Sequence, residues 1–118
     1  MKLNILGAEY TVEVKDYEAE EAFSRHSIAG FCDGYARKIV VCNMRTYPGW
    51  EHELPETIEQ AQKETLRHEI VHAFLDESGL ADSGNVPDCS WAKNEEMIDW
   101  FARQGAKVYR AWQEAGVL

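Results

Sequence analysis

Apolar and polar residues alternate in short runs near the start of the chain, as is typical of β-strands. Residues 3–6 and 10–14 show this alternation on either side of Gly7-Ala8, which predicts a β-hairpin. After it, Asp16 is a suitable N-cap for a short helix over residues 17–26, in which small and apolar residues form a narrow stripe among glutamates. We therefore expect a hairpin followed by a short helix.

A second pair of candidate strands lies at residues 28–31 and 35–42. The two segments flank Asp33-Gly34, a dipeptide that accepts the positive φ angles of a tight hairpin turn. Residues 39–42 are all apolar and should form a buried or half-buried strand. The N-terminal part of the chain is thus expected to contain a small, mainly antiparallel sheet.

The spacing of apolar residues becomes helical after a loop predicted for residues 43–54. Either Pro55, as a first helical residue, or the capping box Thr57-x-x-Gln60 would begin a long helix. This helix should end at Gly79, because glycine readily adopts the left-handed conformation found just beyond many helices.

Turn-forming residues are concentrated at residues 81–89, which predicts a second loop. A last helix should run from an N-cap at Ser90 toward Gly116, with Gly105 as a position where it can bend. Early strands and two long late helices indicate the α+β class. The length of 118 residues fits a single domain spanning residues 1–118.

The charge of the chain argues against some classes of partner. With 21 acidic and 12 basic residues, the formal charge is −9, which opposes binding to phosphate backbones, so no nucleic-acid partner is expected. No apolar run approaches the roughly 20 residues needed to span a bilayer, so no membrane partner is expected either.

The cysteines and the start of the chain favour a cytoplasmic location. Cys32, Cys42 and Cys89 are an odd and sparse set, unlike the even disulfide framework of small secreted domains, so we expect reduced thiols. Cys32 and Cys42 could face each other across the second hairpin. Residues 1–7 are too short an apolar stretch for the core of a signal peptide.

The most informative stretch is His68-Glu69-Ile70-Val71-His72, an H-E-x-x-H motif inside the predicted long helix. Two histidines four residues apart lie one turn from each other on the same helix face, so both can reach one metal ion. Glu69 lies beside them and projects toward a water bound to that metal. This spacing is typical of zinc hydrolases.

A third ligand is expected from the following helix. Asp76 lies eight residues beyond His68, roughly 12 Å along the helix axis at ~1.5 Å per residue, and is therefore not expected to be a ligand. Glu95 can point at the metal, and Asp99, one turn later, can orient a ligand histidine through its other ring nitrogen. Glu96 is the rival third ligand.

These two segments resemble the gluzincins, zinc peptidases with H-E-x-x-H on one helix and a ligand glutamate in an E-x-x-x-D pattern on the next. Residues 95–102 (EEMIDWFA) are also similar to the E-x-x-A-N-x-F-A segment of the ImmA/IrrE family of bacterial and mobile-element metallopeptidases, and small phage-encoded zincins are similar too. Ile98 and Asp99 stand where that family usually has Ala and Asn. The resemblance covers about residues 64–104.

The resemblance implies a small zincin-like domain with a single Zn²⁺ held by His68, His72 and Glu95, and Glu69 as the catalytic base. The implied activity is hydrolysis of peptide bonds in a protein or peptide, in which Glu69 takes a proton from a metal-activated water and returns it to the leaving amine. By the same resemblance, residues 39–42 are expected to pair with an extended peptide substrate.

Several alternatives stay open from the sequence. The chain could instead be a catalytically silent zinc-binding interaction module on the same fold, or it could hydrolyse a non-peptide amide. The sequence does not choose a donor to stabilise the oxyanion, and it does not determine the oligomeric state. The candidate donors are His26, His52, Tyr35, Tyr47 and Tyr109.

Overall fold

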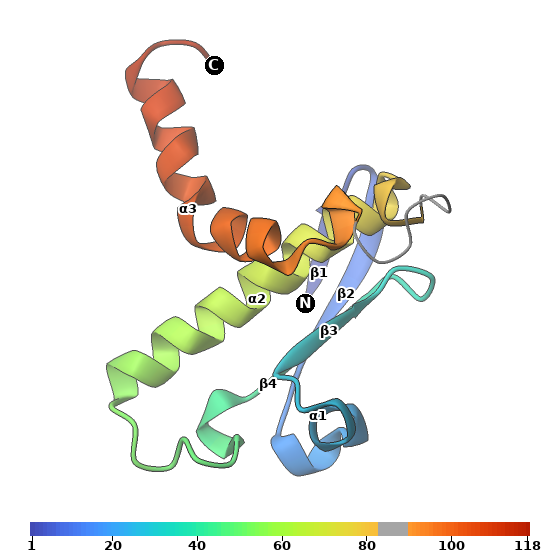
Figure 1. Cartoon of the computed structure of the whole chain (residues 1–118), viewed down its shortest axis with the longest axis vertical. Helices are drawn as coiled ribbons and strands as arrows, with labels where there is room; N and C mark the ends of the chain where they lie inside the picture. Colours follow the sequence, from blue (N-terminus) through green and yellow to red (C-terminus); the bar gives the residue numbers. More distant parts are fainter. Residues whose placement is uncertain (83–89) are drawn as a thin grey trace.

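A four-stranded mixed sheet lies at the centre of the molecule (Figure 1). The computed structural model describes residues 1–82 and 90–118. The strands follow the spatial order β1-β2-β4-β3, and β1–β2 and β3–β4 are antiparallel hairpins, whereas β2 and β4 run parallel. Both predicted hairpins are therefore confirmed, and the parallel pairing joins them. The bounds are β1 (Lys2–Ile5), β2 (Ala8–Lys15), β3 (Gly30–Asp33) and β4 (Lys38–Cys42).

The two hairpin turns differ from the predicted ones. The first turns at Leu6 and Gly7, which both have positive φ angles of 50° and 88°. The second is longer than a two-residue turn: residues 34–37 connect β3 to β4, and the positive φ of 52° belongs to Arg37. Gly34 serves a different purpose, because a Cβ atom there would lie 2.8 Å from the Cβ of Asp76. The prediction of a tight Asp33-Gly34 turn was therefore wrong.

The helix predicted over residues 17–26 is also shorter than expected. A 3-10 turn (Tyr17–Ala19) is followed by α1 (Glu21–His26), which has only six residues. Asp16 is the N-cap residue of the 3-10 turn, as predicted for the start of this segment, but its side chain makes no capping hydrogen bond; its carboxylate accepts a hydrogen bond from the Asn43 side chain at 2.9 Å. This bond fixes the chain after β2 to the chain after β4.

The long predicted helix is α2 (Pro55–Glu77). It begins at Pro55, so the first of the two predicted starts is correct. Gly79 follows with φ +82°, in agreement with the predicted end. A 3-10 turn (Leu80–Asp82) comes next, and most of the predicted loop at 81–89 lies outside the described residues.

The last helix, α3 (Glu95–Glu114), starts later than predicted. Asn94 is its N-cap and accepts a hydrogen bond from the Met97 amide at 2.9 Å, whereas Ser90 precedes a separate 3-10 turn (Trp91–Lys93). Helical structure continues through Gly105, and Figure 1 shows the axis bending partway along α3. No helix in the part of the chain that the structure describes is long and apolar enough to cross a membrane.

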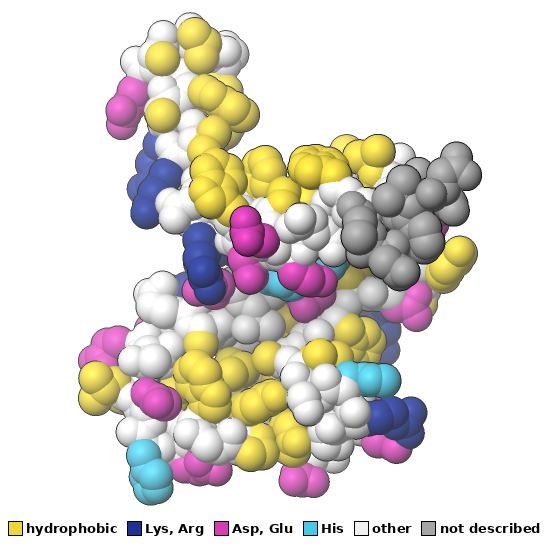
Figure 2. Space-filling model, in the orientation of Figure 1, with side chains coloured by type: hydrophobic (Ala, Val, Ile, Leu, Met, Phe, Trp, Pro, Cys, Tyr) yellow, Lys and Arg dark blue, Asp and Glu magenta, His cyan; other side chains and the backbone are white. Residues whose placement is uncertain are grey.

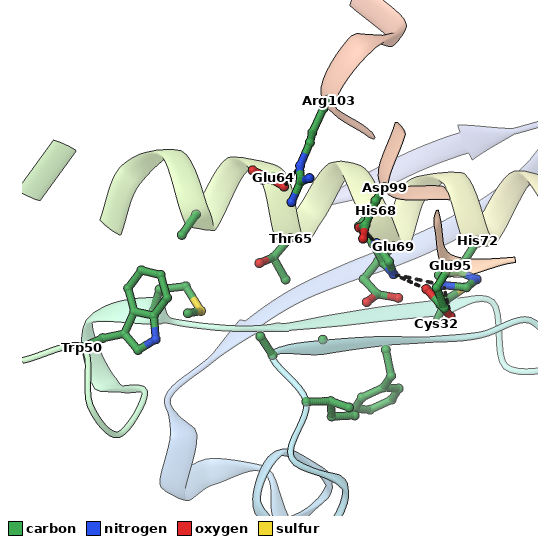
Figure 3. A pocket seen from close by; sticks show the side chains of 16 residues that line it. Cys32, Trp50, Glu64, Thr65, His68, Glu69, His72, Glu95, Asp99 and Arg103 are labelled. Atoms are coloured by element: carbon green, nitrogen blue, oxygen red, sulfur yellow. Dashed lines mark hydrogen bonds and ion pairs between the residues drawn. The ribbon is translucent and has the colours of Figure 1, made fainter. Parts of the chain in front are cut away.

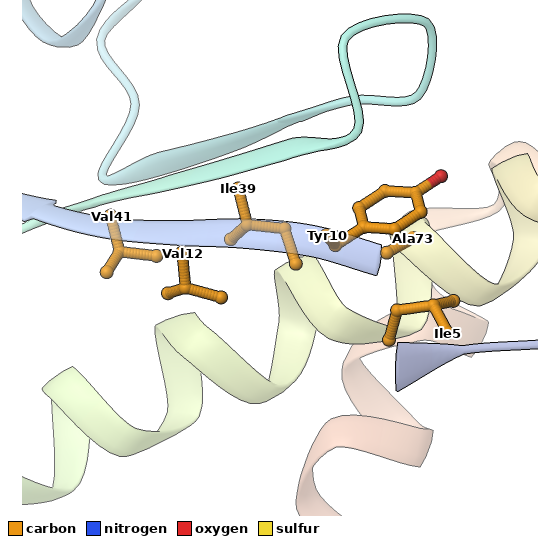
Figure 4. Packing of buried hydrophobic residues seen from close by; sticks show 6 residues of the cluster. All are labelled: Ile5, Tyr10, Val12, Ile39, Val41 and Ala73. Carbon is orange, nitrogen blue, oxygen red and sulfur yellow. The ribbon is translucent and has the colours of Figure 1, made fainter. Parts of the chain in front are cut away.

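Helix α2 crosses one face of the sheet and makes the largest part of the core with it (Figure 4). This first cluster contains Ile5, Tyr10, Val12, Ile39, Val41 and Ala73. On the other side of β4, a second cluster forms around Phe23 of α1. A third and smaller cluster holds α3 against the end of α2, and consists of Leu75, Ala81, Ala92 and Ile98.

The cysteines are not arranged as the sequence suggested. Cys32 pairs in register with Ile39, and the Cys42 amide bonds to the Ala29 carbonyl, so the two cysteines do not oppose each other. Cys32 packs against the first cluster and Cys42 belongs to the second. Both are free thiols; Cys89 lies outside the described residues.

Candidate metal centre

Three of the predicted ligands meet between α2 and α3 (Figure 3). His68 and His72 lie one turn apart on α2, with their Nε2 atoms 3.1 Å from each other. Glu95, the first residue of α3, brings Oε2 to 3.0 Å from Nε2 of His68 and Oε1 to 3.3 Å from Nε2 of His72. The structure therefore gathers two imidazoles and one carboxylate around a common point.

These separations suit a zinc ion. With ligand bonds of about 2.0–2.1 Å, two ligands of a tetrahedral zinc lie about 3.3 Å apart. The three observed separations of 3.0, 3.1 and 3.3 Å are close to that value. A set of two histidines and one glutamate is also the donor set of many catalytic zinc sites, which keep the fourth position open.

Asp99 fixes the orientation of the first histidine. Its Oδ1 lies 2.8 Å from Nδ1 of His68, and because a carboxylate only accepts, Nδ1 carries the proton. The other ring nitrogen of His68, Nε2, faces Oε2 of the Glu95 carboxylate. Two acceptors facing each other at 3.0 Å need a cation or a proton between them. The arrangement accommodates either a cation or a proton at this point, and Asp99 takes the orienting position expected from the sequence.

Glu69 is the buried acid of the site, with only 6% of its surface exposed. Burial raises the pKa of its carboxyl from 4.5 to about 7; the neighbouring His68 lowers it, and the Glu95 and Asp76 charges raise it. Its place beside the two histidines, with a pKa near neutrality, suits a group that accepts and returns a proton.

Two other acids lie outside the ligand group. Glu96 is exposed and does not join His68 and His72, although it follows Glu95 directly. Successive residues of a helix point about 100° apart, so the start of α3 at Glu95 decides which of the two side chains faces α2. Asp76 is also outside the group, and burial raises the pKa of its carboxyl.

The ligand group lies in a groove of about 770 Å³. One wall is α2, which contributes Thr65 as well as the three motif residues, and the other is β3 with the segment before it. Trp50 lies at the far end of the groove from His72 (Figure 3). Arg103 of α3 forms part of the rim and makes an ion pair with Glu64 of α2. A volume of this size accommodates a small ligand or a few residues of a peptide.

The strand expected to pair with a peptide substrate has no free edge, so that expectation was wrong. Residues 39–42 lie in β4, which is bonded to β2 on one side and to β3 on the other, so it has no free edge. The neighbouring β3 (Gly30–Asp33) is an edge strand of the sheet, and Gly30, Phe31 and Cys32 line the groove. Gly30 allows close contact there, because a Cβ atom would lie 3.1 Å from both Cγ and Oε1 of Glu69.

The residues considered as possible oxyanion donors do not line the groove. None of the five candidates, His26, His52, Tyr35, Tyr47 and Tyr109, belongs to the groove lining within the described residues. The sequence analysis in turn missed Thr65, Trp50 and Arg103, which do line it. Thr65 lies three residues before His68, a spacing that places both on one helix face and could have indicated it.

Comparison with known proteins assigns no family to the chain. No family model matches the chain, and no curated protein or solved structure matches it either.

Proposed function

We propose that the chain is a zinc-dependent peptidase with a minimal zincin-like domain. The observation that carries this proposal is the convergence of His68, His72 and Glu95 beside the buried acid Glu69, in an open groove. Three protein ligands leave one position open for water, which separates a catalytic zinc site from a structural site with four ligands. When bound, zinc supplies a water of lowered pKa and polarises a carbonyl group.

Glu69, Asp99 and the edge of β3 would each have a separate role in the reaction. Glu69 takes the proton from the attacking water and delivers it to the leaving amine nitrogen as the peptide C–N bond breaks. Asp99 holds His68 in the tautomer that leaves Nε2 free for the metal. The edge of β3 offers backbone N–H and C=O groups to an extended peptide lying along the groove. Recognition of the backbone suits a protein or peptide substrate.

The test combines metal analysis with a cleavage assay. We expect about one zinc per purified chain, and we expect the H68A/H72A double variant to lose it. Glu95→Ala should weaken zinc binding, whereas the matched variant Glu96→Ala should bind zinc as tightly as the wild type, because Glu96 is outside the ligand group. A wild-type protein that holds no zinc at neutral pH would contradict the site. Equal losses of zinc binding in Glu95→Ala and Glu96→Ala would contradict it as well.

Cleavage is measured on a mixture of unstructured peptides by mass spectrometry. Glu69→Gln should retain zinc and lose turnover by a factor of about 10²–10⁴, the usual contribution of a general base. Unchanged turnover in Glu69→Gln would remove this residue from the mechanism. If the wild type binds zinc but cleaves no peptide, the alternative of a silent zinc-binding interaction module is favoured.

A further inference from the structure

The C-terminal part of α3 leaves the body of the molecule. Up to Ala102 the helix lies against α2: Ile98 and Ala102 are buried, and Arg67 of α2 donates to the Ala102 carbonyl at 2.7 Å. Beyond this point no residue from 103 to 118 is buried within the described structure, and the helix projects away from both α2 and the sheet (Figure 1). We call residues 103–118 the arm.

The arm is strongly amphipathic, although Arg103 at its base pairs with Glu64 of α2 and none of its residues belongs to the three apolar clusters of the described chain. Apolar and small residues recur at helical spacing along one side, namely Phe101 at its base, Gly105, Val108, Tyr109 and Trp112. Charged residues recur along the opposite side, namely Arg103, Lys107, Arg110 and Glu114. Figure 2 shows apolar side chains on one side of the projecting helix and basic ones on the other. An exposed helix without a partner has no need of such a face.

In Figure 2 the apolar side of the arm is continuous with apolar side chains over the rest of α3. The exposed aromatic residues of α3 and of the turn before it, called the aromatic patch below, are Trp91, Trp100, Phe101, Tyr109 and Trp112. Each is 43–58% exposed, which corresponds to about 100 Å² per side chain and about 500 Å² per molecule. Two such patches supply about 1,000 Å², the minimum area expected of a biological protein–protein interface.

The charge distribution favours a second copy of this chain as the partner of the arm. Residues 103–118 contain three basic residues and one acidic residue, net +2, while residues 1–102 contain nine basic and 20 acidic residues, net −11. A basic arm is therefore attracted to the acidic body of another copy, and the exposed Glu96 lies close to Trp100 on the same helix. An anionic lipid surface fits less well, because it would repel the body.

We propose that the arm mediates a symmetric homodimer. The arm of each copy packs with Tyr109 and Trp112 across the outer face of α3 in the other copy, and Lys107 and Arg110 approach its acidic residues. The contact is reciprocal, as in a two-fold symmetric interface, and it covers both aromatic patches at once. This arrangement is independent of zinc binding and of peptidase activity.

Sedimentation velocity on the full chain tests the dimer. The wild type should sediment as a dimer over a roughly hundredfold range of concentration, and the Y109K/W112K variant as a monomer. The matched control is Tyr35→Lys, which alters an aromatic residue that is 96% exposed in the β3–β4 turn and should leave the dimer intact. The charge variant K107E/R110E should raise the dissociation constant at least tenfold.

Circular dichroism is recorded for each variant to check that it is folded, because a misfolded chain gives no information about the interface. The substituted arm positions are exposed, so the spectra and melting temperatures of the dissociated species should stay close to one another. A wild type that is monomeric at the highest concentration, or a dimer that persists in Y109K/W112K, overturns the proposal. Binding of the monomeric wild type to vesicles rich in anionic lipid would also overturn it and point to a membrane surface instead.

Discussion

Glu69 should destabilise the metal-free fold at neutral and alkaline pH. Its carboxyl is 6% exposed, and burial raises its pKa from 4.5 to about 7. The folded state therefore holds this proton over a pH range in which the unfolded chain has already released it. The contribution of Glu69 to stability is present below about pH 4.5 and is lost as the pH rises to about 7.

The magnitude follows from the two pKa values. At about 1.4 kcal/mol per pKa unit, the difference between 4.5 and about 7 corresponds to about 3 kcal/mol of unfolding free energy. Glu69→Gln keeps the size of the side chain and removes the ionisation. We expect this variant to have nearly wild-type stability at pH 4 and to exceed the wild type by up to about 3 kcal/mol at pH 8.

Urea denaturation of chelator-treated protein, followed by tryptophan fluorescence at several pH values, measures this difference. The control is Glu53→Gln, which changes an exposed loop glutamate and should shift stability by less than about 0.5 kcal/mol. Added zinc should reduce the difference between Glu69→Gln and the wild type, because a nearby divalent cation favours the charged carboxylate. Parallel stability curves for Glu69→Gln and the wild type from pH 4 to 8 would refute the reasoning.

Three further substitutions probe the site and its supports. Asp99→Asn should lower zinc affinity about 10–100-fold, because the neutral amide orients His68 less firmly; competition with a chromogenic chelator measures this, and wild-type affinity would contradict the role of Asp99. Gly30→Ala should destabilise the fold by about 1–3 kcal/mol, because its Cβ would lie 3.1 Å from Glu69 atoms and 3.2 Å from Cγ2 of Thr65. Gly105→Ala, where no atom lies within 4 Å of the added Cβ, should instead stabilise helix α3 by up to about 1 kcal/mol; a loss in urea denaturation would contradict this.

The candidate metal ligands were the most predictable part of the molecule. The i, i+4 spacing of His68 and His72 fixes their common face in any helix, so only the helix itself had to be predicted. Glu95 was harder, because Glu96 has the same chemistry. The deciding feature is Asn94, whose cap sets where α3 begins, and the sequence analysis placed that cap at Ser90 instead.

The strand order was less predictable. Local turn signals reveal hairpins, but the parallel pairing of β2 with β4 joins strands separated by α1 and β3, and no local signal encodes it. One clue was present: residues 39–42 are apolar without alternation, which is typical of a strand covered on both faces. Reading that clue fully would have placed β4 in the interior and β3 at the edge.

The bend of α3 was expected at Gly105, but the sequence could not show where the helix leaves the body. The amphipathic pattern continues unchanged from the buried Ile98 to the exposed Trp112, because the same pattern serves packing within the chain and packing between chains. Only the position of α2 distinguishes the part of this face that packs within the chain from the part that stays exposed.

The small third cluster has a consequence for how the molecule opens. Apart from Leu75 and Ile98 its members are alanines, so little apolar surface holds the start of α3 in place compared with the sheet and α2. Amide hydrogens of this helix should therefore exchange with solvent through a partial opening that leaves the sheet folded. Because Glu95 and Asp99 are on α3 while both histidines are on α2, the same opening would separate the ligands, and release of a bound ion would need no global unfolding.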